Sequence, residues 1–365
     1  MMIVSEVVEI IRQFAPFELQ EKYDNVGLQI GSPSQEVKGV LVTLDITEEV
    51  VQEAIELGLN VIVAHHPLIF GGIKKLVGST YVERTVLKCI KNDIAVIIAH
   101  TNADSVKSGV SNKMCEKLGL INCTILSTRE SSLLKLVTFI PNSYLAQVQG
   151  VVFAAGGGDV GNYSECGFTV EGRGSFKAKE GSTPFVGEVG ELHIEKELRF
   201  ETVFPRYKRT QVVNALLKSH PYEEVAYDIY ALENNWSDVG YGMVGELREE
   251  MSEIDFLQRL KEVFDVRCLR HTRLLGRPIK RIALCGGSGS DLLKDAKRAK
   301  ADYYISGDFK YHQFFDADNE LVIVDIGHYE SEQYTKELFF EILTKKIPTF
   351  AICKSSINTN PIKYL

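Results

Sequence analysis

The sequence lacks features that would place it in several common classes of protein. No segment offers about 18 uninterrupted apolar residues, so we expect no membrane-spanning helix. The formal net charge is −8, whereas proteins that bind nucleic acid usually carry a basic face, so nucleic acid is not expected as the main partner. The N-terminus has no basic leader of the kind that opens a signal peptide.

Cysteine is present but is not arranged for chemistry. The seven cysteines are scattered, odd in number and without a C-x-x-C pair, which argues against a thiolate zinc site and against a disulfide framework. No G-x-S-x-G elbow of a serine hydrolase occurs. The simplest interpretation is a reduced, cytoplasmic chain.

The first third of the chain alternates between strand and helix patterns. Continuous runs of valine, isoleucine and alanine predict strands that are buried on both faces, and helices between such strands indicate a parallel sheet. The predicted strands are 39–46, 60–66 and 94–100, and the predicted helices are 47–58 and 80–91.

The last third repeats the same order, which predicts an internal duplication. His100-x-x-x-Asp104 falls opposite His328-x-x-x-Glu332 when the halves are aligned, although any two βαβ units share some likeness. The predicted strands here are 281–287, 302–308 and 320–328, and the predicted helices are 290–301 and 330–345.

The middle of the chain has a different texture. Short alternating strands, aromatic residues and glycine-rich turns over 133–232, with one helix at 209–220, indicate a separate α+β module. We therefore predict a discontinuous α/β core formed by 1–128 and 240–365, with a domain inserted at 129–239.

Four of the eight histidines follow strand ends, where open α/β sheets place their sites. Adjacent His65 and His66 diverge if the chain is extended, so they either serve two ions, or one binds while the other orients. His328 and Glu332 share a helix face, and Glu332 can bridge two ions through its two oxygens. Such ligands suit zinc, iron, manganese or cobalt. The alternative is that these are structural loop histidines. The candidate metal ligands are His65, His66, Asp104, His328 and Glu332, with His100 beside them.

Three further stretches remain ambiguous. The loop 285–291 can aim amides at an anion, or can be a tight strand-to-helix turn, since it lacks a P-loop lysine. Asp308 and His312 can line the same cavity as acid–base or supporting groups, but Asp308 can equally cap a turn. Asp24 caps a turn or contacts a ligand.

Six motifs occur in order along the two halves of the core: DNVGLQIG (24–31), LDIT (44–47), AHHPLIF (64–70), HTNAD (100–104), GDFKYH (307–312) and GHYESE (327–332). Together they resemble the Nif-three-like dinuclear metal-centre family, often labelled GTP cyclohydrolase type 2 homologues. The resemblance implies two divalent ions per chain, held by His65, His66, Asp104, His328 and a bridging Glu332, and a toroidal hexamer. The inserted domain resembles PII and CutA proteins, chiefly through HPYEEVAYDI at 220–229, which implies a ferredoxin-like fold.

Two functional hypotheses follow. The first is a dinuclear metal-dependent hydrolase, which the family label narrows to opening of the purine ring of GTP, with His100 or His312 as catalytic proton carriers. The second is a non-enzymatic metal-binding or regulatory protein whose insert senses a small molecule. A regulator that binds nucleic acid conflicts with the acidic charge.

Overall fold

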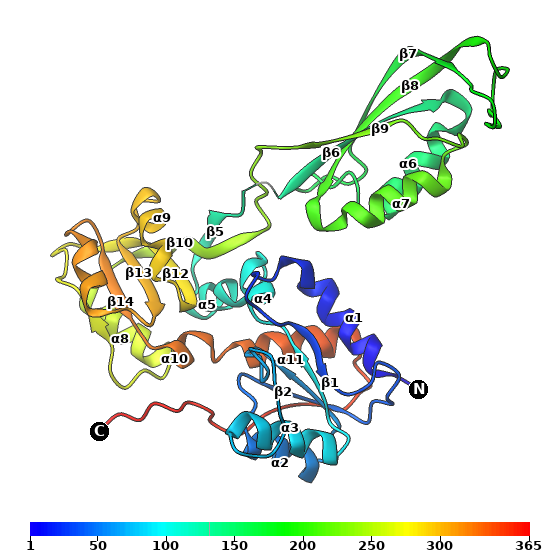
Figure 1. Cartoon of the computed structure of the whole chain (residues 1–365). Coiled ribbons are helices and arrows are strands. Elements are labelled where there is room, and N and C mark those ends of the chain that lie inside the picture. Colours follow the sequence, from blue (N-terminus) through cyan, green and yellow to red (C-terminus); the bar gives the residue numbers. More distant parts are fainter. Residues whose placement is uncertain (131) are drawn as a thin grey trace. The chain divides into compact units, whose positions relative to one another are not determined.

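The computed structural model describes residues 1–130 and 132–365, which form two compact units. The first unit comprises Met1–Thr128 and Asp238–Leu365, and the second comprises Arg129–Ser237. The first contains two sheets with helices on their faces, and the second contains one sheet (Figure 1). Within the described residues, no helix has both the length and the apolar character needed to cross a membrane.

The first sheet of the core lies between two layers of helices. Strands β2, β3 and β4 are parallel, β1 is antiparallel to β4, and β15 is parallel to β2. Alternate residues of the central strands face opposite helical layers, so every position is buried and the strands read as continuous apolar runs. In spatial order the strands are β1 (Gly27–Ile30), β4 (Ala95–Ile98), β3 (Val61–Ala64), β2 (Val40–Thr43) and β15 (Ile352–Lys354), and the first-half helices of this sheet are α1 (Val4–Phe14), α2 (Glu48–Glu56) and α3 (Tyr81–Lys91).

The second sheet repeats this plan. Strands β12, β13 and β14 are parallel, and β11 is antiparallel to β14, as β1 is to β4. This order confirms the predicted duplication. In spatial order the strands are β11 (Arg270–His271), β14 (Val322–Asp325), β13 (Tyr303–Gly307), β12 (Ile279–Ser288), β10 (Gly240–Met251) and β5 (Ile121–Thr128), and the accompanying helices are α8 (Glu253–Val263) and α9 (Leu293–Arg298).

Each half contributes its last long helix to the other half. Helix α5 (Val110–Leu118) follows the first sheet, yet its Met114 belongs to the core of the second sheet with Phe256 and Ile282. Helix α11 (Thr335–Lys346) follows the second sheet, yet its buried Phe339 belongs to the core of the first. Ion pairs from Lys113 to Glu341 and from Lys117 to Glu337 join these two helices. The exchange holds the two sheets together.

The structure corrects two predicted helices and one predicted strand. The predicted helix 290–301 is shorter, because Ser290–Leu292 is a 3₁₀ turn before α9. The predicted helix 330–345 is two helices, α10 (His328–Glu332) and α11, separated at Gln333 and Tyr334. Strand β14 ends at Asp325, so His328 begins α10 instead of ending a strand.

The inserted unit is an antiparallel sheet with two helices on one face. The element order βαββαβ and the strand order β7-β8-β6-β9 are those of a ferredoxin-like fold. Val148 and Val152 of the first helix and Val212 and Leu216 of the second pack on the sheet beside Phe200. The elements are β6 (Leu133–Pro141), α6 (Leu145–Ala154), β7 (Gly167–Lys177), β8 (Leu192–Pro205), α7 (Arg209–Ser219) and β9 (Tyr227–Ala231).

Candidate metal centre

The predicted ligands meet where strands of both sheets end. His65 and His66 follow β3, and His100 follows β4 and precedes α4 (Thr101–Ser105). Asp104 lies on α4, and His328 and Glu332 are the first and last residues of α10. The carboxyl ends of parallel strands carry these groups from the two duplicated halves, so neither half forms the cluster alone.

The donor atoms form two sets that share Glu332. Its Oε1 lies 3.6 Å from Nε2 of His65, which is also 3.6 Å from Oδ1 of Asp104. Its Oε2 lies 2.9 Å from Nε2 of His66 and 3.1 Å from Nε2 of His328. Donors of one tetrahedral zinc ion lie about 3.3–3.6 Å apart, given zinc–ligand bonds of about 2.0–2.2 Å. The 3.6 Å separations of the His65 set match this spacing, and so does the 3.3 Å between Nε2 of His66 and Nε2 of His328. Oε2 of Glu332 lies closer to both of these histidines, at hydrogen-bond distance.

His65 and His66 face different sets, although they are neighbours in the chain. Their ring centroids are 5.0 Å apart, and each Nε2 approaches a different oxygen of Glu332. The adjacent histidines therefore point their Nε2 atoms at different oxygens of one carboxylate. The ring centroid of His100 lies 5.2 Å from that of His65 and 5.5 Å from that of His66, and a donor atom of His100 groups with donors of both.

Buried polar atoms in the cluster lack protein partners. Among the residues that the structure describes, His65 Nε2 and Asp104 Oδ1 are buried and accept or donate no hydrogen bond, and the side chain of His65 is fully buried. Buried polar atoms are rarely left in this state without a ligand, ion or water. The donors are imidazole and carboxylate without thiolate, a set that suits divalent transition metals. The residues therefore fit a metal ion by both geometry and chemistry.

Each histidine is oriented by a hydrogen bond at Nδ1, so that Nε2 turns toward the cluster. His65 Nδ1 bonds the Ala99 carbonyl at 2.9 Å, His66 Nδ1 bonds Asp45 at 2.7 Å, and His100 Nδ1 bonds Asp24 at 2.9 Å. His328 Nδ1 bonds Asp308 at 2.7 Å. Such partners fix the ring of a metal-binding histidine and raise its basicity.

Two of these supporting carboxylates change the sequence interpretation. Asp308 orients His328 and belongs with the supporting groups, and Asp24 contacts a cluster histidine instead of acting only as a turn cap. Asp45 was not predicted to take part in the site. The available signal was its position two residues after β2, because that strand lies beside β3 and ends at the same edge of the sheet.

The carboxylates and histidines strongly shift each other's protonation. Burial lowers the pKa of His66, but bonds to Asp45 and Glu332 outweigh burial and raise it to about 10. The same balance, with Asp308 in place of Asp45, raises the pKa of His328 to about 11. For Glu332, burial is outweighed by His65 and the other histidines, so its pKa lies well below the usual range. Glu332 is therefore held as a carboxylate whose negative charge is balanced by the neighbouring histidines, and a bound cation would compete with their protons.

The glycine loop at 285–291 makes room for Glu332. Gly287 has φ +63°, and a Cβ at this position would collide with Oε1 of Glu332. The amides of Gly287 and Gly289 donate to Ser331 and Ser306, at 2.9 and 3.0 Å. Because both amides are occupied, the structure favours a tight turn over an anion-binding loop.

His312 is not among the residues that contact the cluster. It lies in the 3₁₀ helix Tyr311–Ala317, and its side chain is exposed. Its ring centroid lies 5.2 Å from that of Tyr311 and 6.4 Å from that of Phe315. No contact between His312 and the cluster is found among the described residues. Its catalytic role therefore stays a prediction.

Comparisons with known proteins agree with the resemblance in the motifs. Two curated proteins, both named GTP cyclohydrolase 1 type 2 homolog, are similar to the whole chain. The protein of Bacillus subtilis (strain 168) is 40% identical over 370 residues, covering 99% of this chain and 98% of that protein. The protein of Halalkalibacterium halodurans is 38% identical over 364 residues, covering 98% of each.

Solved structures resemble the same length of chain. A Bacillus cereus protein described as related to NIF3 is 38% identical, with a TM-score of 0.84, covering 99% of this chain and 98% of that one. A Staphylococcus aureus protein is 30% identical, with a TM-score of 0.79, covering 100% and 99%. The family model for Duf34/NIF3 (NGG1p interacting factor 3) matches residues 2–361. By fold, motifs and overall similarity, the chain belongs to the Duf34/NIF3 family.

Proposed function

We propose that this protein is a hydrolase that depends on two divalent metal ions. The observation that carries the proposal is the division of the donors into two sets by the oxygens of Glu332, with orphaned buried atoms on the His65 side. In this proposal His65, Asp104 and Oε1 of Glu332 hold one ion, while His66, His328 and Oε2 hold the other. Zinc, iron, manganese and cobalt all suit these ligands.

The chain's own residues prepare the site for hydrolysis. A pair of divalent ions supplies Lewis-acid activation of water, as in other two-metal hydrolases. The histidine rings are held in place by Asp24, Asp45 and Asp308, so little reorganisation is needed when the ions bind. His100 lies beside the cluster with Nδ1 bonded to Asp24, and we assign it the role of an additional ligand or a proton carrier.

We propose GTP as the substrate, with hydrolytic opening of its purine ring. The support is the name shared by the curated relatives and a pair of aromatic side chains beside the cluster. Phe70 lies 6.4 Å from His100 and 6.2 Å from Tyr23, measured between ring centroids, and both aromatic side chains are exposed. Exposed rings of this kind stack on planar bases, which would place a purine next to the ions.

The test is an assay of metal-reconstituted protein with GTP. In the expected reaction one water adds at C8 and breaks the first C8–N bond, which leaves a formamide. A second water hydrolyses the remaining C8–N bond, so formate and the ring-opened purine should appear in equal amounts. Hydrolysis of another nucleotide or phosphoester, with GTP unchanged, would replace the substrate and keep the class. Two bound ions without any turnover would favour the alternative of a metal-binding regulatory protein.

We also propose a small-molecule substrate, a cytoplasmic location and a homo-oligomer, a toroidal hexamer in particular. The support for the hexamer is the family resemblance of the core motifs. Light scattering coupled to size exclusion should give about six times the 40.9 kDa chain mass. A monomer at micromolar concentration would contradict the hexamer.

A further inference from the structure

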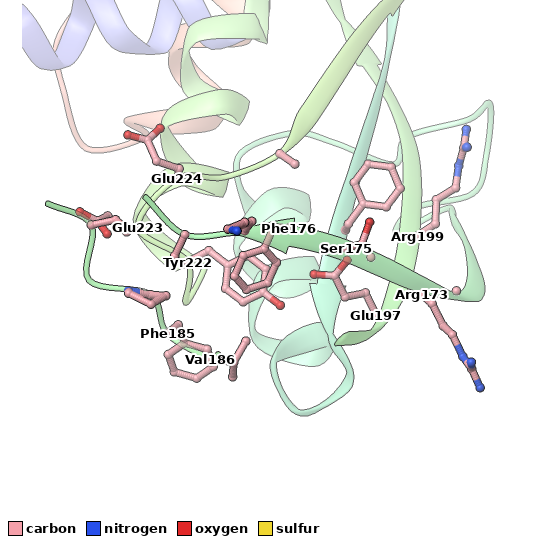
Figure 2. A pocket seen from close by; sticks show the side chains of 18 of the residues that line it. Arg173, Ser175, Phe176, Phe185, Val186, Glu197, Arg199, Tyr222, Glu223 and Glu224 are labelled. Carbon is pink, nitrogen blue, oxygen red and sulfur yellow. The ribbon is translucent and has the colours of Figure 1, made fainter. Parts of the chain in front are cut away.

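The inserted unit contains a cavity that is separate from the metal centre. Its volume is about 710 Å³, within the range of small-molecule sites. The walls come from β7 and β8, from the segment 178–186 that follows β7, and from the turn after α7 (Figure 2). All of the lining residues belong to the inserted unit.

Aromatic rings form much of the inner surface. Tyr222 lies between Phe176 and Phe185, with ring centroids 6.4 and 6.0 Å away. Phe139 and Val186 add apolar surface. Phe185 lines the cavity and is 48% exposed, so its ring is accessible from the cavity side. The rings therefore offer their faces to a ligand.

A carboxylate and a hydroxyl lie beside the aromatic rings of the cavity. Figure 2 shows Glu197 pointing toward Tyr222, whereas Arg173 and Arg199 extend away from both. The Tyr222 hydroxyl is buried and has no hydrogen-bond partner among the described residues. Burial first, and then the Glu197 carboxylate, raise the pKa of Tyr222. The lining as a whole carries charges of both signs, and Arg199 is engaged by Glu201 at 2.7 Å, so Glu197 is the charged group that faces the tyrosine.

Strand β7 is shaped to admit the carboxylate. Gly174 stands opposite Glu195 in the register, and a Cβ at Gly174 would collide with the carboxylate of Glu197. Glycine inside a strand weakens the strand, and it often marks a place where another group must approach the backbone closely. Here the approaching group is the acidic side chain of the cavity.

We propose that this cavity binds a small organic cation, in which an amine or quaternary ammonium group is carried on an aromatic or aliphatic body. The cationic group would contact the Glu197 carboxylate and the Tyr222 hydroxyl, and the body would lie against Phe176 and Phe185. Aromatic faces attract both kinds of cation. A protonated amine also donates to the Glu197 carboxylate and the Tyr222 hydroxyl, whereas a quaternary ammonium group has no N–H and contacts the carboxylate through its charge. The body of either ligand covers the exposed ring.

The test is isothermal titration calorimetry of the full chain with three matched probes. Tryptamine is cationic, tryptophol replaces the ammonium group with a hydroxyl, and indole-3-acetate is anionic. Benzyltrimethylammonium serves as a second cation. We expect binding of the cations and at least about tenfold weaker binding of the other two probes. Equal binding of all three indole probes, preferred binding of the anion, or no heat from either cation at millimolar concentration would overturn the proposal.

Variants locate the binding within the molecule. Glu197→Gln removes only the charge and should weaken tryptamine binding about ten- to a hundredfold, and Tyr222→Phe should weaken it severalfold. Glu195→Gln is the matched control, because Glu195 lies on the same strand, bonds His193 at 2.9 Å and does not line the cavity. Unchanged affinity in Glu197→Gln, or an equal loss in the control, would contradict the assignment. Circular dichroism establishes that each variant is folded. Metal content and turnover of these variants should match the parent, which separates this test from that of the proposed function.

Discussion

The candidate metal centre of the core and the cavity of the inserted unit both contain polar atoms without protein partners, but they are built in different ways. In the core, strand ends from the two duplicated halves converge, and a hydrogen bond at Nδ1 orients each of the four histidines. In the insert, a strand glycine admits Glu197 and aromatic rings surround it. The comparison teaches that a site for an ion needs fixed donors, whereas a cavity for an organic ligand needs space and few polar groups.

The shared carboxylate should be the most sensitive position of the core. Glu332→Gln keeps the shape of the side chain but removes the charge that both donor sets share. We expect the metal content, measured by elemental analysis after reconstitution, to fall from two ions per chain to fewer than one. Glu337→Gln, which alters a carboxylate that pairs with Lys117 on the neighbouring helix, is the control. Two ions retained in Glu332→Gln would remove Glu332 from the ligand set.

The exchanged helix should be the next most sensitive element. Phe339 of α11 is fully buried in the core of the first sheet, so Phe339→Ala should lower the free energy of unfolding of the core by about 3–5 kcal/mol. Calorimetry that resolves the unfolding transitions measures this change. Phe315→Ala, at a side chain that is 68% exposed, should change stability by less than about 0.5 kcal/mol. Equal effects in the two variants would argue against the helix exchange as a source of stability.

An orienting carboxylate should matter less than a ligand. Asp45→Asn keeps the volume and an oxygen that accepts from Nδ1 of His66, but it removes the negative charge that strengthens this bond and raises the basicity of the ring. Metal affinity, measured by competition with a chelator, should fall about 10- to 100-fold. Asp295→Asn, at a carboxylate that pairs with Arg298 on α9, should leave the affinity unchanged. A complete loss of metal in Asp45→Asn would instead make Asp45 a ligand.

A substitution in the cavity of the insert should change the free energy of unfolding least. Tyr222→Phe removes a buried hydroxyl that has no partner among the described residues, so the free energy of unfolding of the inserted unit should stay within about 0.5 kcal/mol or rise slightly. Thermal unfolding of the ligand-free protein measures this. A loss of about 2 kcal/mol would show that the hydroxyl holds the fold together, and would weaken its assignment to a ligand.

The elements of the fold were largely accessible from the sequence. Buried strands such as Val61–Ala64 can be recognised as continuous apolar runs. Thr47 is a typical N-cap residue, and in the structure its side chain accepts a hydrogen bond from the Val50 amide at the start of α2. The split of the last helix was missed, because Gln333 and Tyr334 are compatible with a helix and the break depends on how α10 and α11 pack. Local propensity does not encode a break that tertiary contacts impose.

The candidate metal ligands could be predicted from the sequence, but the groups that orient and accommodate them could not. Histidines at strand ends and the repeated His-x-x-x-carboxylate spacing identified the donors, since such residues are unusual after buried strands. Asp45 and Gly287 carried no comparable signal. One orients His66 and the other makes room for Glu332, and both roles exist only between segments that are distant in the chain.

The duplicated strands and helices, the inserted module and the candidate metal-binding residues were predicted from local apolar patterns and from the chemistry of histidine and carboxylate. The packing of α5 and α11 on each other's sheets, and the place of Glu332 between two sets of donors, appear only in the folded chain. The cavity of the insert, with Glu197 beside aromatic rings, appears only there as well. Packing between distant segments fixes the distances between side chains, and no local pattern contains those distances.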